Sequence, residues 1–356
     1  MTRPASAAEY RAGAPPGLRL LVTGGMGFIG SNFVRHALRT RPGWRIVNLD
    51  KLTYAGNPAN LADLERTPEG ERHRFVRGDI GDATLVGRLF DEGLDAVVNF
   101  AAESHVDRSI LDAAPFLRTN VAGTQTLLDA ARRAGLWRFV QVSSDEVYGP
   151  APDGAAFTED ARLQPTSPYA ASKAAADLLC QAYHRTYGLP VIISRCTNNY
   201  GPYQYPEKFI PLVIIRALDG EPIPLYGDGR QIRDWLHVAD HCEAICRVLE
   251  SGTPGEVYNV AAGTSLTNRE LAERVLRLVG RPVSLVRQVE DRPAHDRRYA
   301  LDAGKIRATL GFAPARALDE GLADTVRWYV DHEAWWRPIT SGEFRRFYDA
   351  WYAQRR

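Results

Sequence analysis

The segment TGGMGFIG at residues 23–30 decides how the first half of this chain is organised. It ends the apolar run RLLVTG (19–24) and opens the segment GSNFVRHALRT, whose apolar residues recur with helical spacing. Gly24, Gly27 and Gly30 permit a tight turn and close backbone approach, and the following helix presents its N-terminus to an anion. A strand, a glycine turn and a helix in this order predict a pyrophosphate site, although a plain strand–turn–helix can use the same glycines.

Further apolar runs follow the glycine turn. They are rich in Val, Ile and Phe and continuous rather than alternating, as in parallel strands that helices cover on both faces. Segments with helical spacing, such as VAGTQTLLDAARRAG, separate them. This alternation predicts an α/β fold with a doubly wound parallel sheet, a Rossmann fold. The predicted strands are RLLVTG (19–24), RIVNLD (45–50), RFVRGD (74–79), DAVVNFAA (95–102), RFVQVSS (138–144) and VIISRC (191–196).

The alternation of strands and helices ends after the sixth predicted strand, where turn-rich stretches mix with helices. We expect a smaller, mixed α/β domain there, which covers the crevice at the strand ends where open α/β sheets bind ligands. The predicted organisation is a disordered tail at 1–17, a Rossmann domain at 18–197 and a substrate domain over most of 198–356. The strand-like EVYNVA (256–261) is a candidate for return to the first sheet.

Composition and charge exclude several classes of protein. The 356 residues carry a formal net charge of +1, which indicates neither a nucleic-acid nor an acidic-membrane partner. No apolar run approaches membrane-spanning length, and residues 1–17 lack a signal-peptide core, so a cytoplasmic protein with reduced thiols is expected. Cys242 and Cys246 lie near His237 and His241, but no second ligand cluster is in view, and no metal site is expected.

The strand after the glycine turn ends in an acid, Asp50, twenty residues beyond Gly30. An acid here can accept a hydrogen bond from a ribose 2′-hydroxyl and would repel a 2′-phosphate, which favours NAD over NADP as the cofactor. Lys51, directly after it, weakens this preference. Asp79 and Ile80 end the third strand and are expected to form a wall for the adenine. The alternative is that the two aspartates are only helix caps or turn residues.

Tyr169 and Lys173 form a Y-x-x-x-K pair whose members share one face of a predicted helix. We expect the lysine and an oxidised nicotinamide to favour the phenolate, which takes a proton from an alcohol as hydride leaves its carbon. A surface helix with two unrelated residues is the alternative, and the position downstream of a dinucleotide fold favours the functional interpretation. Together these features resemble the extended short-chain dehydrogenase/reductase superfamily. That resemblance implies NAD in the Rossmann domain and often a nucleotide-sugar in the C-terminal domain.

The segment VSSDEVYG (142–149) places Asp145 and Glu146 at the end of a buried strand. Alcohol oxidation does not need them. Loss of water beside a new ketone needs a base at the neighbouring carbon and an acid for the hydroxyl one carbon further on. Adjacent acids in a dry site resist double ionisation, so one keeps its proton. A regular strand would point them to opposite faces, one as a cap and one into solvent, so the paired interpretation requires that strand geometry ends near Ser144.

Seven longer motifs resemble the dTDP-glucose 4,6-dehydratase family, over a span from about residue 18 to beyond 310. Related sugar epimerases and decarboxylases share the glycine loop and Y-x-x-x-K but are not expected to carry the adjacent acids. The resemblance implies an NAD-dependent lyase that acts on dTDP-glucose, with a homodimer as the expected assembly. The motifs are LDKLTYAGNPANL (49–61), AAESHVDRSI (101–110), SSDEVYG (143–149), YAASK (169–173), NNYGPYQYPEKFIP (198–211), RDWLHV (233–238) and RPAHDRRYA (292–300).

The resemblance also implies a role for each residue of the reaction. Tyr169 would be the base for the C4 hydroxyl while NAD takes the C4 hydride, and Lys173 would tune that phenol and hold the nicotinamide ribose. Glu146 would remove the C5 proton, and Asp145 would protonate the departing C6 hydroxyl. Return of the hydride to C6 would give dTDP-4-keto-6-deoxyglucose. Ser144 would hydrogen-bond the substrate at a position that is more usually Thr in the family, where the extra methyl restricts the rotamer.

Binding residues follow from the same motif matches, although any single Arg or Lys is commonly a solvated surface charge. Two arginines of the substrate set are expected to clamp the diphosphate through bidentate hydrogen bonds. The expected cofactor-binding residues are Gly24, Gly27, Phe28, Ile29, Gly30, Asp50, Lys51, Leu52, Thr53, Asp79, Ile80, Phe100, Ala101, Ala102, Ser104, Thr119, Tyr169, Lys173 and Asn199. The expected substrate-binding residues are Ser104, His105, Ser144, Asn198, Lys208, Phe209, Pro224, Tyr226, Arg233, Asn268, Arg292 and His295.

Two other functions remain open from the sequence. One is a different nucleotide-sugar enzyme, such as a UDP-sugar dehydratase, a 4-epimerase or a decarboxylase. The other is a catalytically silent dinucleotide sensor that binds partners. The intact tyrosine, lysine and paired acids argue against the sensor.

Overall fold

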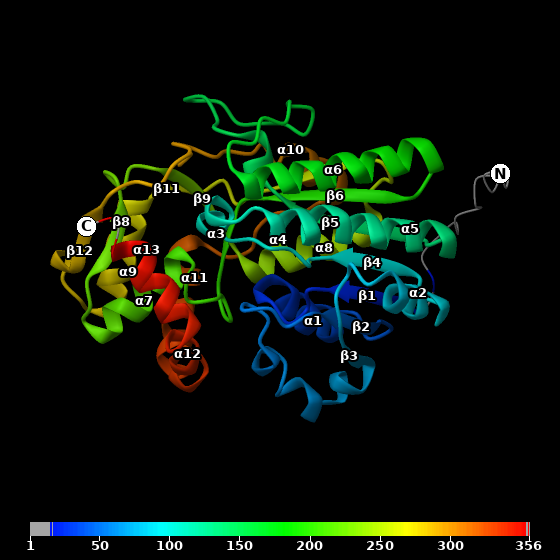
Figure 1. Cartoon of the computed structure of the whole chain (residues 1–356), viewed down its shortest axis with the longest axis horizontal. Coiled ribbons are helices and arrows are strands. Elements are labelled where there is room, and N and C mark those ends of the chain that lie inside the picture. Colours follow the sequence, from blue (N-terminus) through cyan, green and yellow to red (C-terminus); the bar gives the residue numbers. More distant parts are fainter. Residues whose placement is uncertain (1–14, 16, 354, 356) are drawn as a thin grey trace.

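The computed structural model describes residue 15, residues 17–353 and residue 355. The predicted tail at 1–17 therefore lies almost wholly outside the described residues. The described chain forms one large parallel sheet covered by helices and, beside it, a smaller region of helices and short strands (Figure 1). No helix among the described residues combines the length and apolar character needed to cross a membrane.

Seven parallel strands form the large sheet, in the order β10-β6-β5-β4-β1-β2-β3. The strand order reverses between β1 and β4, and ligands of such sheets bind at this switch point. The predicted doubly wound parallel sheet is confirmed, and β10 shows that the late strand returns to it. The strands are β1 (Arg19–Thr23), β2 (Arg45–Asp50), β3 (His73–Arg77), β4 (Ala96–Asn99), β5 (Arg138–Ser144), β6 (Val191–Cys196) and β10 (Val257–Val260).

Helices cover both faces of the large sheet because its strands are apolar on both sides. Leu20 and Val22 of β1 pack into one core cluster, and Leu21 packs into another on the opposite face. One face carries α1 (Phe28–Thr40), α8 (Val238–Ser251) and α10 (Gly304–Leu310). The other face carries α2 (Ala83–Asp91), α5 (Thr124–Ala134) and α6 (Pro168–Tyr187). Ahead of α5 lie α3 (Val106–Leu111), α4 (Ala114–Phe116) and the π-helical η4 (Leu117–Gly123).

The smaller region has its own core, in which Ile214, Trp235, Leu271 and Tyr329 are buried. The sequence from 198 onward does not stay in this region, because α8, β10 and α10 belong to the large sheet. Its helices are α7 (Phe209–Asp219), α9 (Asn268–Val279), α11 (Leu318–Asp331), α12 (Glu333–Thr340) and α13 (Glu343–Ala353). Its strands are β7 (Asn198–Tyr200), β9 (Ile232–His237) and β11 (Ser265–Thr267) in one sheet, and β8 (Ile223–Tyr226) with β12 (Val286–Val289) in another.

Short single turns connect the longer elements. They include η5 (Asp145–Tyr148), which follows β5 directly and is central to the site. The others are η1 (Pro58–Asn60), η2 (Leu64–Arg66), η3 (Pro68–Arg72) and η6 (Val283–Leu285).

Candidate active site

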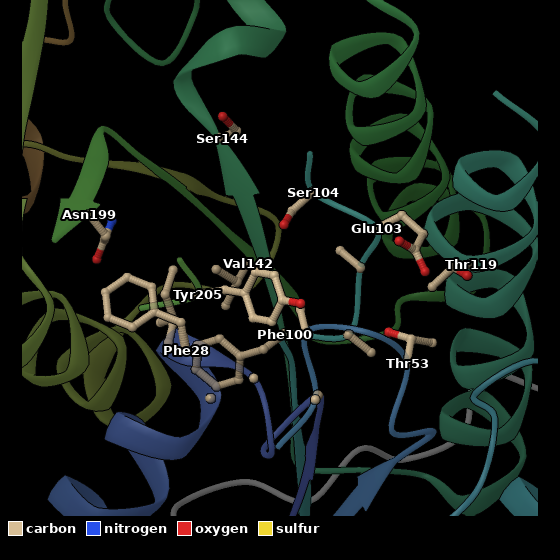
Figure 2. A pocket seen from close by; sticks show the side chains of 18 of the residues that line it. Phe28, Thr53, Phe100, Glu103, Ser104, Thr119, Val142, Ser144, Asn199 and Tyr205 are labelled. Carbon is tan, nitrogen blue, oxygen red and sulfur yellow. The ribbon is translucent and has the colours of Figure 1, made fainter. Parts of the chain in front are cut away.

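A cavity of about 300 Å³ opens at the carboxyl ends of the parallel strands. Its lining comes from the glycine turn after β1, the ends of β2, β4, β5 and β6, and the first turns of α6. Figure 2 shows Ser144 at the end of β5, with Thr53, Glu103 and Thr119 grouped in another part of the lining. The cavity thus lies at the switch point, where the fold predicts a ligand.

The glycine turn can receive a pyrophosphate only because side chains are absent from it. Gly24 has φ +70°, and a Cβ there would lie 2.7 Å from the Ala101 nitrogen. A Cβ on Gly30 would lie 2.2 Å from the Gly24 carbonyl oxygen. Gly27 caps α1 without a side-chain hydrogen bond, so no side chain competes for the N–H groups of the first turn. These features fit the phosphates of a dinucleotide at the helix N-terminus.

Asp50, at the end of β2, is held by two backbone N–H groups, one from the glycine turn and one from the loop after β2. Its Oδ2 accepts a hydrogen bond from the Met26 N–H at 2.9 Å, and its Oδ1 accepts one from the Leu52 N–H at 2.8 Å. Burial raises the pKa of this carboxyl. Lys51 Nζ lies 2.6 Å from Asp79 Oδ2, so its charge is engaged with an acid. Because Asp79 engages the Lys51 charge, Lys51 no longer weakens the preference for NAD over NADP.

The expected cofactor-binding residues line this cavity with one exception. Leu52 does not line it, but takes φ 58° and donates its N–H to Asp50. Its contribution in this structure is to orient the carboxylate beside it. Several further lining residues were not predicted, among them Glu103, Gln204, Tyr205 and Glu207.

The acid pair lies where β5 ends. The chain turns into the 3₁₀ helix η5 at Asp145, so the alternation of strand side chains stops one residue earlier. Ser144 Oγ accepts a hydrogen bond from the Glu146 N–H at 3.2 Å and donates one to Asp145 Oδ1 at 3.1 Å. Gly149, at φ +78°, closes the turn against the Gln164 carbonyl. Both acids consequently line the same cavity, as the paired interpretation requires.

Both acids have a raised pKa, and different neighbouring charges act on each of them. Burial raises the pKa of Asp145 to about 8; the charge of Glu146 adds to the rise and that of Arg233 opposes it. Burial also raises the pKa of Glu146, and Arg292 and Arg233 oppose the rise. Asp145 Oδ2 is buried without a hydrogen-bond partner among the described residues. At neutral pH the raised pKa of Asp145 favours its protonated form.

Tyr169 and Lys173 lie at the start of α6, and both are buried. Ser167 caps this helix by accepting a hydrogen bond from the Ala170 N–H. Lys173 Nζ donates a hydrogen bond to the Val142 carbonyl at 2.6 Å. Burial raises the pKa of the Tyr169 phenol well above its usual value, with the Glu146 charge adding to the rise. The lowering expected from Lys173 together with an oxidised nicotinamide stays a prediction, because the raised pKa reflects the chain's own groups alone.

The expected substrate-binding residues divide into two groups. Ser104, Asn198, Lys208 and Ser144 line the cavity itself. Lys208 Nζ also donates a hydrogen bond to the Ser104 carbonyl at 2.8 Å, which fixes the position of the ammonium group. Burial lowers the pKa of Lys208. These four residues extend the cofactor cavity toward the smaller region.

The arginines of the second group are already engaged within the chain. Arg292 Nη1 lies 2.8 Å from Asp107 Oδ1, and Tyr226 Oη donates to Asp107 Oδ2 at 2.8 Å. Arg233 Nη2 donates to the Asp296 carbonyl at 2.9 Å. Both arginines influence the pKa of Glu146, so the second group adjoins the acid pair electrostatically.

The remaining expected substrate residues are placed by packing. The His295 ring lies 5.7 Å from the Tyr226 ring, and its Nδ1 is 2.6 Å from Asp291 Oδ1. His105 caps α3 and lies edge-on to Phe347 of α13, with ring centroids 5.6 Å apart. None of the residues of the second group lines the cavity. The last three of them lie in or beside elements of the smaller region: Phe209, Pro224 and Asn268.

Sequence reasoning missed Tyr299 and Asp107. Tyr299 Oη lies 3.5 Å from Glu146 Oε2 and donates to Asp296 Oδ2 at 3.0 Å. Tyr299 is the penultimate residue of the motif RPAHDRRYA, and Asp107 lies within ESHVDRS, so both residues belong to motifs that the sequence singled out. The motifs alone do not distinguish these two residues from their neighbours, whereas the three-dimensional contacts do.

A group of three potential metal ligands occurs away from the cavity. His36, Glu243 and Cys246 bring ligand atoms within 4.8 Å of one another. Glu243 is already paired with Arg41 and Arg247, at 2.8 and 3.0 Å. Because two guanidinium groups neutralise this carboxylate, the group is better described as an ion-pair network between α1 and α8.

The comparisons agree with the site geometry. A family model described as GDP-mannose 4,6 dehydratase matches residues 21–325. The dTDP-glucose 4,6-dehydratase of Streptomyces niveus is 56% identical over 328 residues, covering 91% of this chain and 96% of its own. That of Xanthomonas campestris pv. campestris (strain B100) is 51% identical over 344 residues, covering 91% and 97%. The chain belongs to the dTDP-glucose 4,6-dehydratase family.

Solved structures extend this comparison beyond the dTDP-glucose 4,6-dehydratase family. The family member from Streptomyces venezuelae, solved with NAD and TYD bound, is 55% identical with a TM-score of 0.87, covering 90% of this chain and all of its own. A UDP-glucose 4-epimerase from Thermus thermophilus, solved with NAD, is 33% identical with a TM-score of 0.82, covering 88% and 100%. Because the fold is shared with epimerases, the residues of the site have to distinguish the reactions.

Proposed function

We propose that this chain is an NAD-dependent lyase that converts dTDP-glucose to dTDP-4-keto-6-deoxyglucose and water. The observation that carries the proposal is the acid pair, because Asp145 and Glu146 line one cavity with Tyr169. Oxidation or epimerisation at C4 needs one proton-transfer group, whereas elimination across C5 and C6 needs two more. The named relatives and the relative solved with NAD and TYD support the same substrate and cofactor.

The proposed reaction begins at C4. Tyr169 takes the proton of the C4 hydroxyl, and Ser144 holds the substrate oxygen beside it. Bound NAD supplies the redox chemistry, as it accepts the C4 hydride and later returns it to C6. Lys173, fixed by the Val142 carbonyl, lies at the start of α6 where it would hold the nicotinamide ribose. The new C4 ketone makes the neighbouring C5 proton acidic.

Elimination then uses the acid pair. Glu146 takes the C5 proton, while Asp145 gives its proton to the C6 hydroxyl, which leaves as water. When the hydride has reached C6, Glu146 returns a proton to C5. One proton passes from Tyr169 to Asp145 by way of solvent, and the cycle closes with the loss of one water molecule. The raised pKa of Asp145, about 8, supports its assignment as the acid.

The second group of substrate residues would bind the nucleotide diphosphate. Arg233 and Arg292 offer planar guanidinium groups to the phosphates, and Tyr226 offers a ring to the base. Arg292 would have to exchange or share its carboxylate partner Asp107 when the diphosphate binds. This exchange is the main rearrangement that the proposed substrate complex requires.

We also propose a homodimer located in the cytoplasm. Leu117 and Leu178 are each 55% exposed and lie on the helical segments 113–134 and 170–185, where the sequence has apolar helix faces. Large apolar side chains exposed on neighbouring helices favour burial against a second copy. Sedimentation of the purified chain would give its mass in solution, and a monomeric mass would contradict the dimer.

One assay tests the proposed function. The purified chain, loaded with NAD, is incubated with dTDP-glucose, and the alkali-absorbing 4-keto-6-deoxy sugar is followed. Formation of this sugar without net reduction of NAD is expected. Appearance of dTDP-galactose instead would indicate a 4-epimerase, and binding of NAD without any change in the sugar would indicate the dinucleotide sensor.

A further inference from the structure

The side chain of Arg108, in α3, lies between two aromatic rings from distant parts of the sequence. Its guanidinium carbon is 3.9 Å from the centroid of the Tyr54 ring and 4.3 Å from that of the Phe347 ring. Its Nε lies 3.2 Å from Glu207 Oε2, and the Glu207 side chain is only 3% exposed. A planar cation between two rings is attracted to both faces, and a buried carboxylate fixes its orientation.

Tyr54 belongs to the loop that forms one wall of the cofactor cavity. Its neighbours Thr53, Ala55 and Gly56 line that cavity. The Tyr54 ring also packs edge-on against Tyr205, with centroids 5.4 Å apart, and Tyr205 lines the cavity as well. The contact with Arg108 therefore bears directly on the position of this wall.

Phe347 belongs to α13, which follows the segment 21–325 that the family model matches. Figure 1 shows α12 and α13, in orange-red and red, as part of the smaller region. Trp351, one turn after Phe347, donates its indole N–H to Tyr226 Oη at 2.6 Å. The Phe347 ring also contacts His105. The helix is thus packed against residues expected to bind substrate, outside the cofactor cavity.

We propose that Arg108 is a positioning residue that clasps the cofactor loop, through Tyr54, to α13, through Phe347, and so slows the release of NAD. The inference rests on the proposed function. A reaction that removes a hydride at C4 and returns it at C6 fails whenever the reduced cofactor leaves between the two steps. A clasp that joins the cofactor wall to the substrate side keeps the cavity closed during that interval.

The test measures the rate at which NAD dissociates from the full chain, by desalting the loaded protein and assaying retained NAD over time. Arg108→Leu is expected to raise the rate about 10-fold, since it removes two cation–π contacts. Phe347→Ala is expected to raise it several-fold, although Phe347 lies outside the cofactor cavity. Arg108→Lys keeps the charge but loses the planar stacking. Its NAD dissociation rate is expected to lie between those of the unaltered chain and Arg108→Leu.

Arg138→Leu is the matched control. Arg138 stacks on Trp137 at 4.9 Å, at the opposite end of β5 from the cavity. Its loss is expected to leave NAD dissociation unchanged. Melting temperatures of all variants separate loss of the clasp from loss of the fold, and Phe347→Ala and Arg108→Lys decide the question if Arg108→Leu does not fold.

Two results would overturn the clasp. One is an unchanged NAD dissociation rate in folded Arg108 variants. The other is a rate that changes in Arg108→Leu but not in Phe347→Ala, because Arg108 would then act on the loop alone. The proposed function fails separately, if the unaltered chain makes no 4-keto-6-deoxy sugar from dTDP-glucose. Faster NAD release in the clasp variants, with intact sugar formation in the unaltered chain, supports both proposals.

Discussion

The cofactor half and the substrate half of the site are built in different ways. The cofactor half is made of backbone at strand ends and a glycine turn, and Asp50 is held there by two backbone N–H groups. In the substrate half, Arg292 is paired with Asp107 and Arg233 with the Asp296 carbonyl. In the first half, internal hydrogen bonds hold Asp50 in place at the cavity. In the second half, the proposed binding of phosphates requires Arg292 to exchange or share its internal partner. The acid pair lies at the border between them.

Glu146→Gln is expected to have the largest effect, because it removes the proposed base at that border. Overall turnover should fall about 10²- to 10⁴-fold. Hydride transfer from C4 should persist, because Tyr169 is unchanged, and would appear as absorbance of reduced cofactor in a single turnover. In D₂O, exchange of the C5 proton should be lost. Normal C5 exchange in this variant would remove Glu146 from its assigned role.

Replacement of one residue from each half should separate their contributions. Arg292→Leu is expected to raise the KM for dTDP-glucose about 10- to 100-fold, since a charge-assisted hydrogen bond to phosphate is lost. The amount of bound NAD should not change.

Asp50→Ala is expected to weaken NAD binding about 10-fold, while the KM for dTDP-glucose at saturating NAD changes little. Steady-state kinetics and NAD titration check both, and equal effects of the two variants on NAD binding would show that the halves are not separable.

Asp145→Asn tests the environment of the acid pair through stability. The folded-state pKa of Asp145, about 8, lies above the ordinary value of 3.8, so the fold favours the protonated form. As pH rises from about 4 to about 8, the unfolded chain loses this proton first, and the native state loses stability. The variant carries no such charge. Its melting temperature should match that of the unaltered chain near pH 4 and exceed it by at least about 2 °C near pH 9.

The outcome that contradicts this account is a melting-temperature difference that does not change with pH. Glu146 has to be considered in the same experiment, because its charge contributes to the raised pKa of Asp145. Asp153→Asn, at an exposed turn, provides a control in which the pH dependence of stability should match that of the unaltered chain.

Ser144→Thr is expected to have the smallest effect. The Ser144 hydroxyl is already oriented by the Glu146 N–H and Asp145 Oδ1, so the rotamer restriction of a threonine methyl adds little. Turnover should change by less than about 3-fold, whereas Ser144→Ala should lower it by about 10-fold or more. A large gain in turnover for Ser144→Thr would show that serine leaves the hydroxyl poorly positioned.

The sequence predicted the cofactor half well because its residues act locally. Gly24, Gly30 and Asp50 follow from strand, turn and helix signals within short segments, and the structure places all three on the cavity. The sequence also predicted the acid pair, but not the 3₁₀ turn after Ser144 that directs both acids to one cavity. Backbone geometry at a strand end depends on what packs there, which local propensity does not contain.

The contacts of the substrate half and the protonation states of the site were harder to predict from the sequence. The partnership of Arg292 with Asp107 joins residues 185 positions apart, and no local pattern encodes it. Burial and the Glu146 charge raise the pKa of the Tyr169 phenol, whereas the predicted lowering depends on Lys173 together with an oxidised nicotinamide. Such pKa shifts depend on burial and on the sum of surrounding charges, which only the assembled structure provides.

The most direct test of the central claim follows the C4 hydrogen itself. The chain loaded with NAD converts dTDP-glucose that carries deuterium at C4, and the product is examined by mass spectrometry and NMR. The account predicts that the deuterium is retained and found in the C6 methyl group. Deuterium recovered at C4 of a 4-epimer, or in released reduced cofactor, would contradict it.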